Sequence, residues 1–573
     1  MTVVNRGISK KPDRFHERFD GAGEVINPLW PRITTEESTK QFSPRDGGLR
    51  ILMINPPIRE WSYPNIMPIG QGYVAAVATM DGHQVRVLDL NAERQKPVED
   101  AGPAFSAWVC DRVLNAVKSH KPEVIGIGGI ITQYGRIKQI VETCKEAEPS
   151  IPVILGGGIG SSMPEFMIKR IKVDAVVLEE GEVTVSELLH RIEMNTPLDG
   201  LKGVAFRKKT GRGDWEVVNN GFRPSIKSMK QGLDSLPWPL RESWSIDDVY
   251  KNNPVGHLNW QTKWIDGVSV ATDQYSASMI ASRGCPYAVN ACDYCYAAYL
   301  GADYRLRSPS EVVDEMEYLQ QRYGLAYIHF IDDLMLTDYR WNLEFCEELG
   351  RRRRQSGFEV TWGGTCRTNI VAAEVQRAKR EGRPNFLEQA FEVGMRQVGY
   401  GVESASQTIL TSIDKSGQTP ERIEIAVRET KRIFGYADCS FIIGSPGETK
   451  DTVQETVEFC KKVGLNPEVF FFTTAYPATK FWDLAMEKGL IAKAVTGKIG
   501  PADEDMIEEY FLRLGEQGDA IRTNFSDLPD HEIVDLSWWA IEQLGAQNTV
   551  RHPHTGEVQE RKPAVRGASR ADL

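Results

Sequence analysis

The strongest constraint on this chain is a group of three cysteines within eleven residues, Cys285, Cys292 and Cys295. They are separated by six and then two residues, in a stretch with Gly, Pro and Asn that predicts a loop. Three thiolates on one loop can reach a single inorganic site, since soft sulfur ligands select iron-sulfur cores, zinc or copper(I). A structural zinc site needs a fourth ligand, and the nearest histidines, His257 and His329, lie about thirty residues away. The spacing therefore favours an iron-sulfur cluster with one iron left open by the protein.

Three other interpretations of these cysteines stay open on the sequence alone. Disulfides are disfavoured, because the chain shows no secretory signal and its other six cysteines are scattered singly. A zinc knuckle and a chance group of buried cysteines are weaker alternatives. Reduced thiols of this kind are typical of a cytoplasmic protein.

The residues around the cysteines resemble the cluster loop of radical S-adenosylmethionine (SAM) enzymes. The stretch reads Ser282-Arg283-Gly284-Cys285-Pro286-Tyr287, followed by Cys292-Asp293-Tyr294-Cys295. In that family three cysteines hold a 4Fe-4S cluster, and the amino and carboxylate groups of SAM chelate the fourth iron. The usual spacing is three and then two residues, so residues 289–291 look like an insertion, which a flexible loop tolerates. The resemblance implies that Cys285, Cys292 and Cys295 are the cluster ligands.

Length and composition place the chain among globular proteins of two or three domains. It has 573 residues, of which 41% are hydrophobic and 26% charged. No run of about 18 apolar residues occurs, so a membrane span is not expected. The net charge of -11 argues against nucleic acid as a partner, because phosphate binding needs a basic face. The arginine run at residues 351–354 is best explained as the solvated end of a helix.

The first half of the chain alternates short apolar runs with helical patterns. After a polar, irregular leader over residues 1–48, the apolar runs predict five buried strands. They cover residues 50–55, 84–90, 124–130, 152–155 and 175–178. Residues 69–80 and 135–147 have helical periodicity. This rhythm predicts an α/β fold with a doubly wound, Rossmann-like parallel sheet, which binds ligands beyond the carboxyl ends of its strands.

Glycines and polar residues follow three of these strands, where Gly lets the backbone approach a large ligand closely. They are Thr132, Gly156, Gly157, Gly158 and Glu180. With the order of the segments, residues 49–195 resemble the cobalamin-binding domain of B12-dependent radical SAM enzymes. The resemblance implies cobalamin with its nucleotide tail near Thr132 and residues 156–158, and with residues 63–70 covering the corrin. No Asp-x-His-x-x-Gly motif supplies a cobalt ligand, and His83 is expected to be a packing histidine.

A proline-punctuated stretch over residues 196–275 is expected to link this domain to a second one. From residue 276 to about residue 490, strands again alternate with helices, such as the helix expected at residues 308–323. Strands are expected at residues 326–331, 359–362, 397–400, 437–443 and 468–473, after one that enters the cysteine loop. Each ends in a polar or Gly-rich turn, which predicts a partial (β/α)6 barrel with its active site at the carboxyl rim.

At this rim, the resemblance to radical SAM enzymes implies the residues that hold the cosubstrate. They are Tyr294, Asp332, Asp333, Arg367, Glu403, Gly444 and Pro446. Tyr294 is expected near the adenine, and Arg367 beside the SAM carboxylate. Asp332 and Asp333 are expected at its ammonium or ribose, Glu403 at the ribose hydroxyls, and residues 444–448 at the adenine edge. A core role for Tyr294 and a surface ion pair for Arg367 compete with these roles, whereas a charged residue at a strand end favours function for Asp332 and Glu403.

Three segments complete the chain. Tyr476-Pro477-Ala478-Thr479 resembles the terminal turn of the radical SAM barrel, with Ala where Gly is common. Residues 491–548 are acidic and helical, and are expected to form a cap over the barrel mouth. Residues 549–573 are rich in Arg, Pro and Gly and are expected to be a disordered tail.

Together these resemblances imply a cobalamin-dependent radical SAM enzyme. In such enzymes a reduced cluster passes an electron to SAM, and the resulting 5'-deoxyadenosyl radical abstracts hydrogen from an unactivated carbon. The leading hypothesis is a methyltransferase that uses methylcobalamin on an unactivated carbon or phosphorus centre. A non-methylating cyclase or oxidative enzyme is the first alternative, and a non-catalytic metal or redox sensor is another. The expected partners are a small-molecule or peptide substrate and an external flavodoxin- or ferredoxin-like electron donor.

Overall fold

The computed structural model divides the chain into two compact units, Met1–Tyr250 and Lys251–Leu573. It describes residues 47–58, 60, 63–96, 98, 102–211, 214–224, 232–252, 275–288, 291–296, 304–415, 417–467, 469–514, 521–545, 549–551 and 558–560. Nearly all of the expected leader lies outside these residues. Among the described helices, none combines the length and apolar character needed to cross a bilayer.

A seven-stranded sheet forms the centre of the first unit, in the order β2-β1-β3-β4-β5-β6-β7. Its strands are β1 (Arg50–Asn55), β2 (Gln84–Asp89), β3 (Val124–Gly128), β4 (Val153–Gly156), β5 (Ala175–Val177), β6 (Val204–Lys209) and β7 (Trp215–Asn219). Strands β1 to β5 pair in parallel, whereas the β5–β6 and β6–β7 pairs are antiparallel. The doubly wound prediction is confirmed, and each of the five expected strands begins within one residue of its predicted start. Residues 204–219, which we assigned to the linker, instead extend this sheet.

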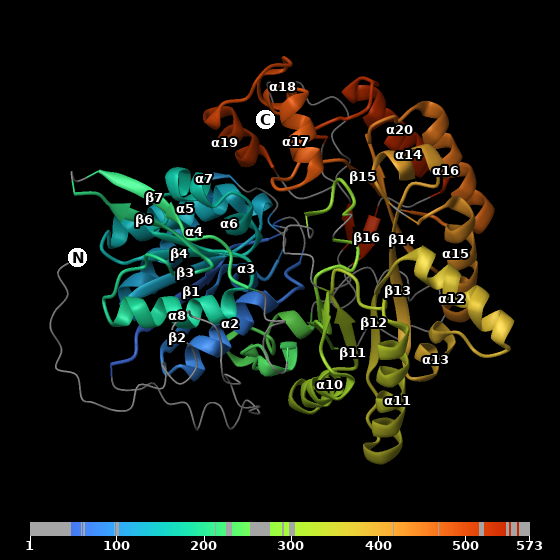
Figure 1. Ribbon diagram of the computed structural model, residues 1–573, viewed down its shortest axis with the longest axis horizontal. Coiled ribbons are helices and arrows are strands. Elements are labelled where there is room, and N and C mark those ends of the chain that lie inside the picture. Colours follow the sequence, from blue (N-terminus) through green and yellow to red (C-terminus); the bar gives the residue numbers. More distant parts are fainter. Residues whose placement is uncertain are drawn as a thin grey trace. The chain divides into compact units, whose positions relative to one another are not determined.

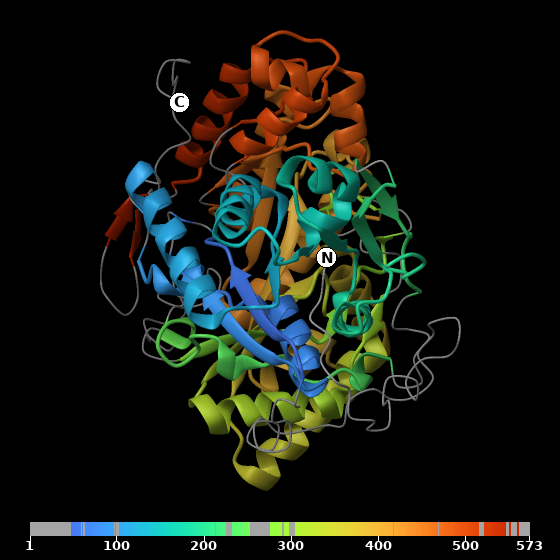
Figure 2. The same ribbon diagram turned by 90° about the vertical axis from the view of Figure 1, so that its left-hand side faces the viewer.

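Helices cover both faces of the first sheet (Figures 1 and 2). On one face lie α2 (Ile69–Met80) and α8 (Gly181–Glu193); on the other lie α4 (Pro103–His120), α5 (Tyr134–Ala147) and α7 (Pro164–Ile171). The short helices α3 (Leu90–Glu93), η1 (Ile131–Gln133) and α6 (Gly158–Ser162) follow strand ends. Met53, Ala76 and Leu188 share one buried apolar cluster between the sheet and α2 and α8. His83 is buried and accepts a hydrogen bond from Leu49 N at 3.1 Å, so the packing role is confirmed.

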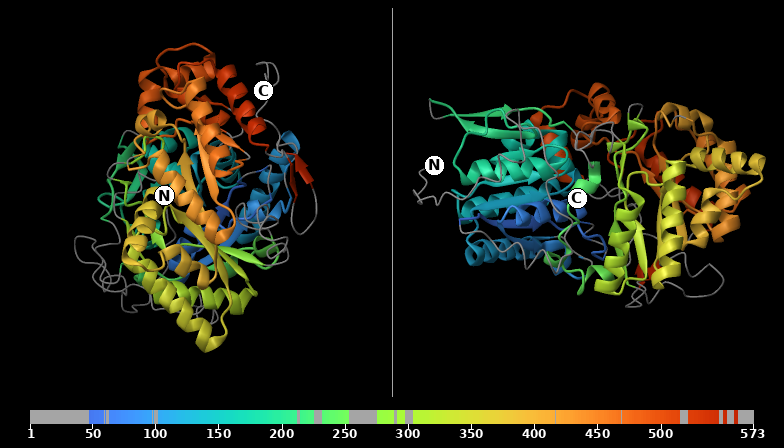
Figure 3. Two further views of the ribbon diagram at one scale, coloured as in Figure 1. Left: turned by 90° about the vertical axis from the view of Figure 1, so that its right-hand side faces the viewer. Right: turned by 60° about the horizontal axis from the view of Figure 1, so that its bottom comes forward.

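The second unit contains a six-stranded, wholly parallel sheet in the order β15-β14-β13-β12-β11-β8. Its strands are β8 (Ser276–Met279), β11 (Tyr327–Phe330), β12 (Thr361–Cys366), β13 (Met395–Glu403), β14 (Asp438–Ile443) and β15 (Phe470–Phe472). Its helices are α10 (Pro309–Tyr323), α11 (Tyr339–Ser356), α12 (Thr368–Glu381), α13 (Phe386–Glu392), α14 (Gln407–Ser412), α15 (Pro420–Phe434) and α16 (Lys450–Val463). This is the expected partial (β/α)6 barrel (Figures 1 and 3). The arginine run lies in the last turns of α11, where Arg351 pairs with Glu348, and Arg352 with Asp314 and Glu317. Arg351 and Arg354 are exposed, as expected of a solvated helix end, whereas Arg352 and Arg353 are half-buried.

Strands β12 and β13 are longer than predicted, because they continue through glycines that the sequence analysis assigned to turns. A Cβ added to Gly363 would lie 2.3 Å from Tyr327 Oη. Glycine is therefore needed within β12 so that the tyrosine on the neighbouring strand can pass over its backbone. Glu403, expected after β13, is its last residue.

α17 (Lys480–Glu487) lies within the segment predicted as the barrel domain. The helical region expected at residues 491–548 contains α18 (Leu490–Thr496), α19 (Glu504–Arg513) and α20 (Asp530–Gln543). Its residues 521–525 reach the ends of β14 and β15: Phe525 N donates to Gly444 O at 2.9 Å, and Ala475 N donates to Thr523 Oγ1 at 3.0 Å. Within the tail expected to be disordered, β16 (Thr549–Arg551) and β17 (Val558–Glu560) pair antiparallel, which corrects the prediction at these residues.

Candidate functional site

The cysteine loop, residues 284–296, follows the short strand β9 (Ser282–Arg283), which pairs with β10 (Arg305–Leu306). Cys285, Cys292 and Cys295 are half-buried and form no disulfide. Burial raises the pKa of the Cys285 thiol, while the nearby Arg367 guanidinium opposes the rise. Within the described residues, no three His, Cys, Asp or Glu side chains converge closely enough to hold a metal ion. Three free thiols on one partly exposed loop have the soft-donor chemistry that an iron-sulfur cluster needs. The three sulfur atoms lie on this loop but do not converge on a common metal position.

Asp332, just beyond β11, anchors the entry to the cysteine loop. Its buried carboxylate accepts hydrogen bonds from Ala281 N at 3.0 Å and from the Ser282 N–H and hydroxyl. Burial raises the pKa of Asp332 to about 6, although these hydrogen bonds favour the charged form. Both partners precede the first cysteine by only a few residues, so Asp332 positions the loop, and its expected contact with SAM stays a prediction. Asp333 is exposed and lies near Cys285.

Arg367, at the start of α12, holds the first half of the loop. Its guanidinium lies 3.9 Å from the centre of the Tyr287 ring, and Asn369 Nδ2 donates to Tyr287 Oη at 3.1 Å. Arg367 is buried, which excludes the competing surface ion pair. The face of an aromatic ring attracts a guanidinium, so this stack fixes Tyr287 against α12.

A closed triangle of hydrogen bonds holds the second half of the loop. Glu403 Oε1 accepts from Tyr294 Oη and from Lys415 Nζ, each at 2.8 Å, and Lys415 Nζ donates to Tyr294 Oη at 2.7 Å. The Glu403 and Lys415 side chains are each over nine-tenths buried. Burial raises the pKa of Tyr294 well above its usual range, and the Glu403 charge adds to the rise. Glu403 also has a φ of 67°, a left-handed conformation that non-glycine residues rarely adopt and that clusters at functional sites.

Asp293 ties the same half of the loop to the end of the barrel. Its backbone N–H donates to Ile413 O at 3.1 Å, and its carbonyl accepts from Phe481 N at 2.9 Å. Lys480 Nζ bridges the carboxylates of Asp293 (2.7 Å) and Asp414 (3.3 Å). Lys480 follows the terminal turn in which Ala stands where Gly is common, and Ala478 there has a φ of 63°.

The turn after β14 is built around a buried carboxylate. Glu448 accepts from Thr452 Oγ1 at 2.6 Å and from the backbone N–H groups of Gly444 and Ser445. Burial raises the pKa of Glu448 to about 7. Gly444 has a φ of 90°, and its carbonyl accepts from Thr473 Oγ1 at 2.8 Å, while Pro446 is half-buried. The turn is thus preformed, and its contact with adenine stays a prediction.

In the first unit, glycines bring the ends of β3 and β4 together. A Cβ on Gly157, whose φ is 82°, would lie 2.6 Å from Gly129 O. Gly129 N donates to Gly156 O at 3.3 Å, and Ile159 N donates to Gly129 O at 3.2 Å. By contrast, a Cβ on Gly156 would meet nothing within 4 Å. The edge therefore offers open room beside Gly156, which fits the large ligand that the sequence analysis expects there.

The other expected ligand residues of the first unit lie along the same edge. Thr132 is half-buried in η1 after β3, Gly158 begins α6 after β4, and Glu180 is half-buried just before α8. Glu179 N donates to Ser161 Oγ at 2.8 Å, which ties the end of β5 to α6. The structure thus brings these residues to the carboxyl ends of three adjacent strands, and their contacts with cobalamin stay predictions.

Sequence reasoning missed Lys415, Gln133 and Ser161. No local pattern marks them, because Lys415 pairs with residues 12 and 121 positions away and Gln133 with residues 76 and 77 positions away. Only the expectation that a buried Glu403 needs a cation could have prompted a search for Lys415.

Comparison with protein families divides the chain in the same way. The B12 binding domain matches residues 62–189, and the radical SAM superfamily matches residues 279–460. The chain therefore belongs to the radical SAM enzymes that carry a B12-binding domain. Its cofactors are accordingly cobalamin, SAM and a 4Fe-4S cluster.

Individual relatives cover most of the chain. An uncharacterised methyltransferase of Pyrococcus horikoshii is 28% identical over 470 residues, 81% of this chain and 89% of the relative. The cytidylyl-2-hydroxyethylphosphonate methyltransferase of Streptomyces wedmorensis is 23% identical over 77% of this chain and 82% of its own. The anaerobic magnesium-protoporphyrin IX monomethyl ester cyclase of Rubrivivax gelatinosus is 25% identical over 66% of this chain and 60% of its own.

A solved structure shares the fold. The radical SAM methyltransferase TsrM from Kitasatospora setae, solved with cobalamin and a 4Fe-4S cluster, aligns with a TM-score of 0.60 at 19% identity. The alignment covers 86% of this chain and 91% of that one.

Proposed function

We propose that the chain is a cobalamin-dependent radical SAM methyltransferase acting on an unactivated carbon or phosphorus centre. The observation that carries the proposal is the union in one chain of a B12-binding sheet and a radical SAM barrel with three reduced thiols on one loop. The named methyltransferases among its relatives support methyl transfer as the outcome. The bound groups would supply the radical and the methyl group, while the protein positions them and excludes water.

Within this proposal, some residues of the chain bind the cofactors directly and others hold those residues in position. Cys285, Cys292 and Cys295 hold the cluster, and Asp332, Arg367 and Lys415 fix the path of the loop that carries them. The SAM site at the barrel rim is lined by Tyr294, Asp332, Asp333, Arg367, Glu403, Gly444 and Pro446. Thr132, Gly156, Gly157, Gly158 and Glu180 receive cobalamin.

The proposal also names partners. A small molecule or peptide is the substrate, and a flavodoxin- or ferredoxin-like protein supplies electrons. A cytoplasmic location suits the nine cysteines, none of which forms a disulfide.

Methyl-labelled SAM tests the proposal. Reconstituted, anaerobic protein is incubated with a reductant, labelled SAM and a metabolite extract, and label is followed into small molecules by mass spectrometry. We expect label in a substrate-derived product together with 5'-deoxyadenosine. Product without label, alongside 5'-deoxyadenosine, would overturn methyl transfer and favour the cyclase alternative, which the likeness to the Rubrivivax cyclase supports. Bound zinc without SAM cleavage would favour a metal or redox sensor.

A further inference from the structure

The strand order of the first sheet reverses direction between β1 and β3. The chain passes from β1 to β2 on one side and then returns to β3 on the other. In doubly wound sheets, ligands bind in the crevice at such a switch point, beyond the carboxyl ends of the two strands. The loops after β1 and β3 therefore decide how a ligand can enter this edge.

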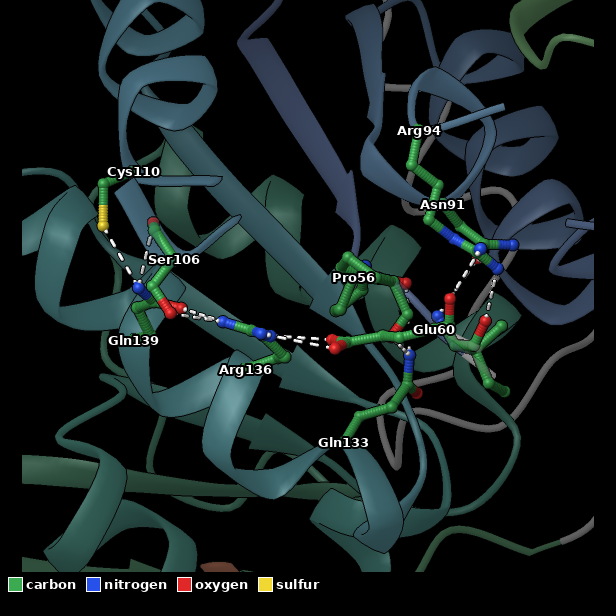
Figure 4. Close-up of polar contacts among 11 residues, drawn as sticks. Pro56, Glu60, Asn91, Arg94, Ser106, Cys110, Gln133, Arg136 and Gln139 are labelled. Carbon is green, nitrogen blue, oxygen red and sulfur yellow. Dashed lines mark hydrogen bonds and ion pairs between the residues drawn. The ribbon is translucent and has the colours of Figure 1, made fainter. Parts of the chain in front are cut away.

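In this chain the side chain of Gln133 bridges those two loops (Figure 4). Gln133 Nε2 donates to Pro56 O at 3.1 Å and to Pro57 O at 2.9 Å, in the loop after β1. Gln133 Oε1 accepts from Ile130 N at 3.0 Å, in the turn after β3. Gln133 is only 8% exposed, so these bonds are shielded from water, and losing them would leave buried polar groups without partners.

The loop after β1 is also held from its far side. Arg136 of α5 binds both carboxylate oxygens of Glu60, at 2.7 and 3.3 Å (Figure 4). Arg94 donates to Ile58 O at 2.9 Å and to Glu60 O at 3.2 Å. Ile58 and Glu60 are therefore held in place a few residues before residues 63–70, which we expect to cover the corrin.

The two sides of η1 differ in the room they offer. Toward β1, the Gln133 amide occupies the gap between the loops. Toward β4, a Cβ on Gly156 would find nothing within 4 Å. Ile130, between them, is an exposed apolar side chain at 40%. The β4 side of η1 therefore offers open space beside an exposed apolar side chain, whereas the Gln133 amide fills the β1 side.

We propose that Gln133 is a positioning residue for cobalamin. By joining the loops after β1 and β3, it closes the switch-point crevice and holds the turn that carries Ile130 and Thr132 in the shape that receives the cofactor. The inference rests on the proposed function only in taking cobalamin as the ligand of the first unit.

Gln139 provides a matched control. It lies on α5, the helix that begins directly after Gln133, and its amide also bridges two elements, donating to Ser106 O at 3.1 Å and to Cys110 Sγ at 3.3 Å, both in α4. Among the described residues, its only link to the loop after β1 is indirect, since its Oε1 accepts from Arg136 Nη1 at 2.9 Å. Gln133→Leu and Gln139→Leu therefore each remove one amide bridge, but only the first concerns the ligand edge.

The test is a titration of full-length apoprotein with hydroxocobalamin, followed by absorbance, with the thermal midpoint of each apoprotein recorded in parallel. We expect the two variants to lower the thermal midpoint by similar amounts. Only Gln133→Leu should raise the Kd for hydroxocobalamin, by about tenfold or more. Should Gln133→Leu fail to fold, Gln133→Glu carries the same expectation, since it keeps the acceptor for Ile130 N–H and loses both donors. Equal Kd values for the Gln133 and Gln139 variants would overturn the inference. Failure of the unaltered protein to bind cobalamin would instead overturn the proposed function.

Discussion

The two units present the same kind of ligand edge, the carboxyl ends of parallel strands, but build it from different chemistry. At the first edge the groups that join the ends of the strands are neutral: Gly156 and Gly157 shape the backbone, and Gln133 and Ser161 join the loops. At the second edge the decisive groups are charged and buried: Asp332, Arg367, Glu403, Lys415 and Glu448 are each less than one tenth exposed. The structure of a neutral edge depends on its shape and hydrogen bonds, whereas the structure of a charged edge depends on which partner compensates each buried charge.

The largest expected effect concerns the loop that the second edge supports. Cys292→Ser removes one of three soft donors, so the protein should lose most of its iron and sulfide, and 5'-deoxyadenosine formation should fall to background. Cys110→Ser is the control, because Cys110 is a half-buried thiol of the first unit. Unchanged deoxyadenosine formation by Cys292→Ser would show that these thiols do not hold the cluster.

Next in size is the loss of a buried charge. Lys415→Met leaves Glu403 buried without its cation, and breaking such a pair costs about 3–5 kcal/mol of unfolding free energy. Lys493→Met is the matched control, because its pair with Asp530 is half-exposed and contributes only about 0–1 kcal/mol. Denaturant unfolding of both apoproteins measures the contrast, and similar losses would mean that burial does not set the second edge apart.

At the first edge, neighbouring glycines should behave oppositely. Gly157→Ala combines a glycine-only backbone conformation with a Cβ 2.6 Å from a carbonyl oxygen, so it should destabilise the apoprotein by about 3 kcal/mol. Gly156→Ala has open space and should change stability by less than about 0.5 kcal/mol while weakening cobalamin binding severalfold. Unfolding curves and cobalamin titrations of both variants check this, and a Gly156→Ala protein with normal cobalamin affinity would remove Gly156 from the site.

The charged edge should also make stability depend on pH. Because the pKa of Glu448 is raised to about 7, its favourable contribution is complete below about pH 4.5 and is lost as the pH rises through 7. The unfolding free energy of Glu448→Gln minus that of the unaltered protein should therefore increase as the pH rises from 5 to 8, by on the order of 2 kcal/mol. Glu455→Gln, at an exposed position of α16, the helix that follows this turn, should show a flat difference. A flat difference for Glu448→Gln as well would mean that its carboxylate is ionised at little cost.

The smallest expected effect is local. Ala478 has a φ of 63°, which costs an L-residue about 1 kcal/mol, so Ala478→Gly should raise the apoprotein's stability by about 0.5 kcal/mol once the flexibility of Gly in the unfolded chain is counted. Ala475→Gly, where φ is not positive and the residue is buried, should instead destabilise. A loss of stability in both variants would show that the terminal turn is not strained.

Much of the fold was readable from the sequence. Apolar runs bounded by turn residues located β1 and α2 to the residue, since periodicity and breakers act locally. The same reasoning predicted β12 and β13 to be shorter than they are, because a glycine such as Gly363 or Gly401 is locally indistinguishable from a turn residue. It also missed β6 and β7 within the expected linker, since an edge hairpin of a mixed sheet lacks the strand-helix rhythm.

For the candidate site, the sequence determined the donors and the general position of each edge: three cysteines on a loop, glycines after β3 and β4, and carboxylates after β11 and at the end of β13. Only the tertiary structure decided the partners. Lys415 reaches across 121 residues to Tyr294, and Gln133 reaches across 77 residues to Pro56. A residue's type and spacing follow from local chemistry, but what compensates a buried charge or an amide depends on which distant segments folding brings beside it.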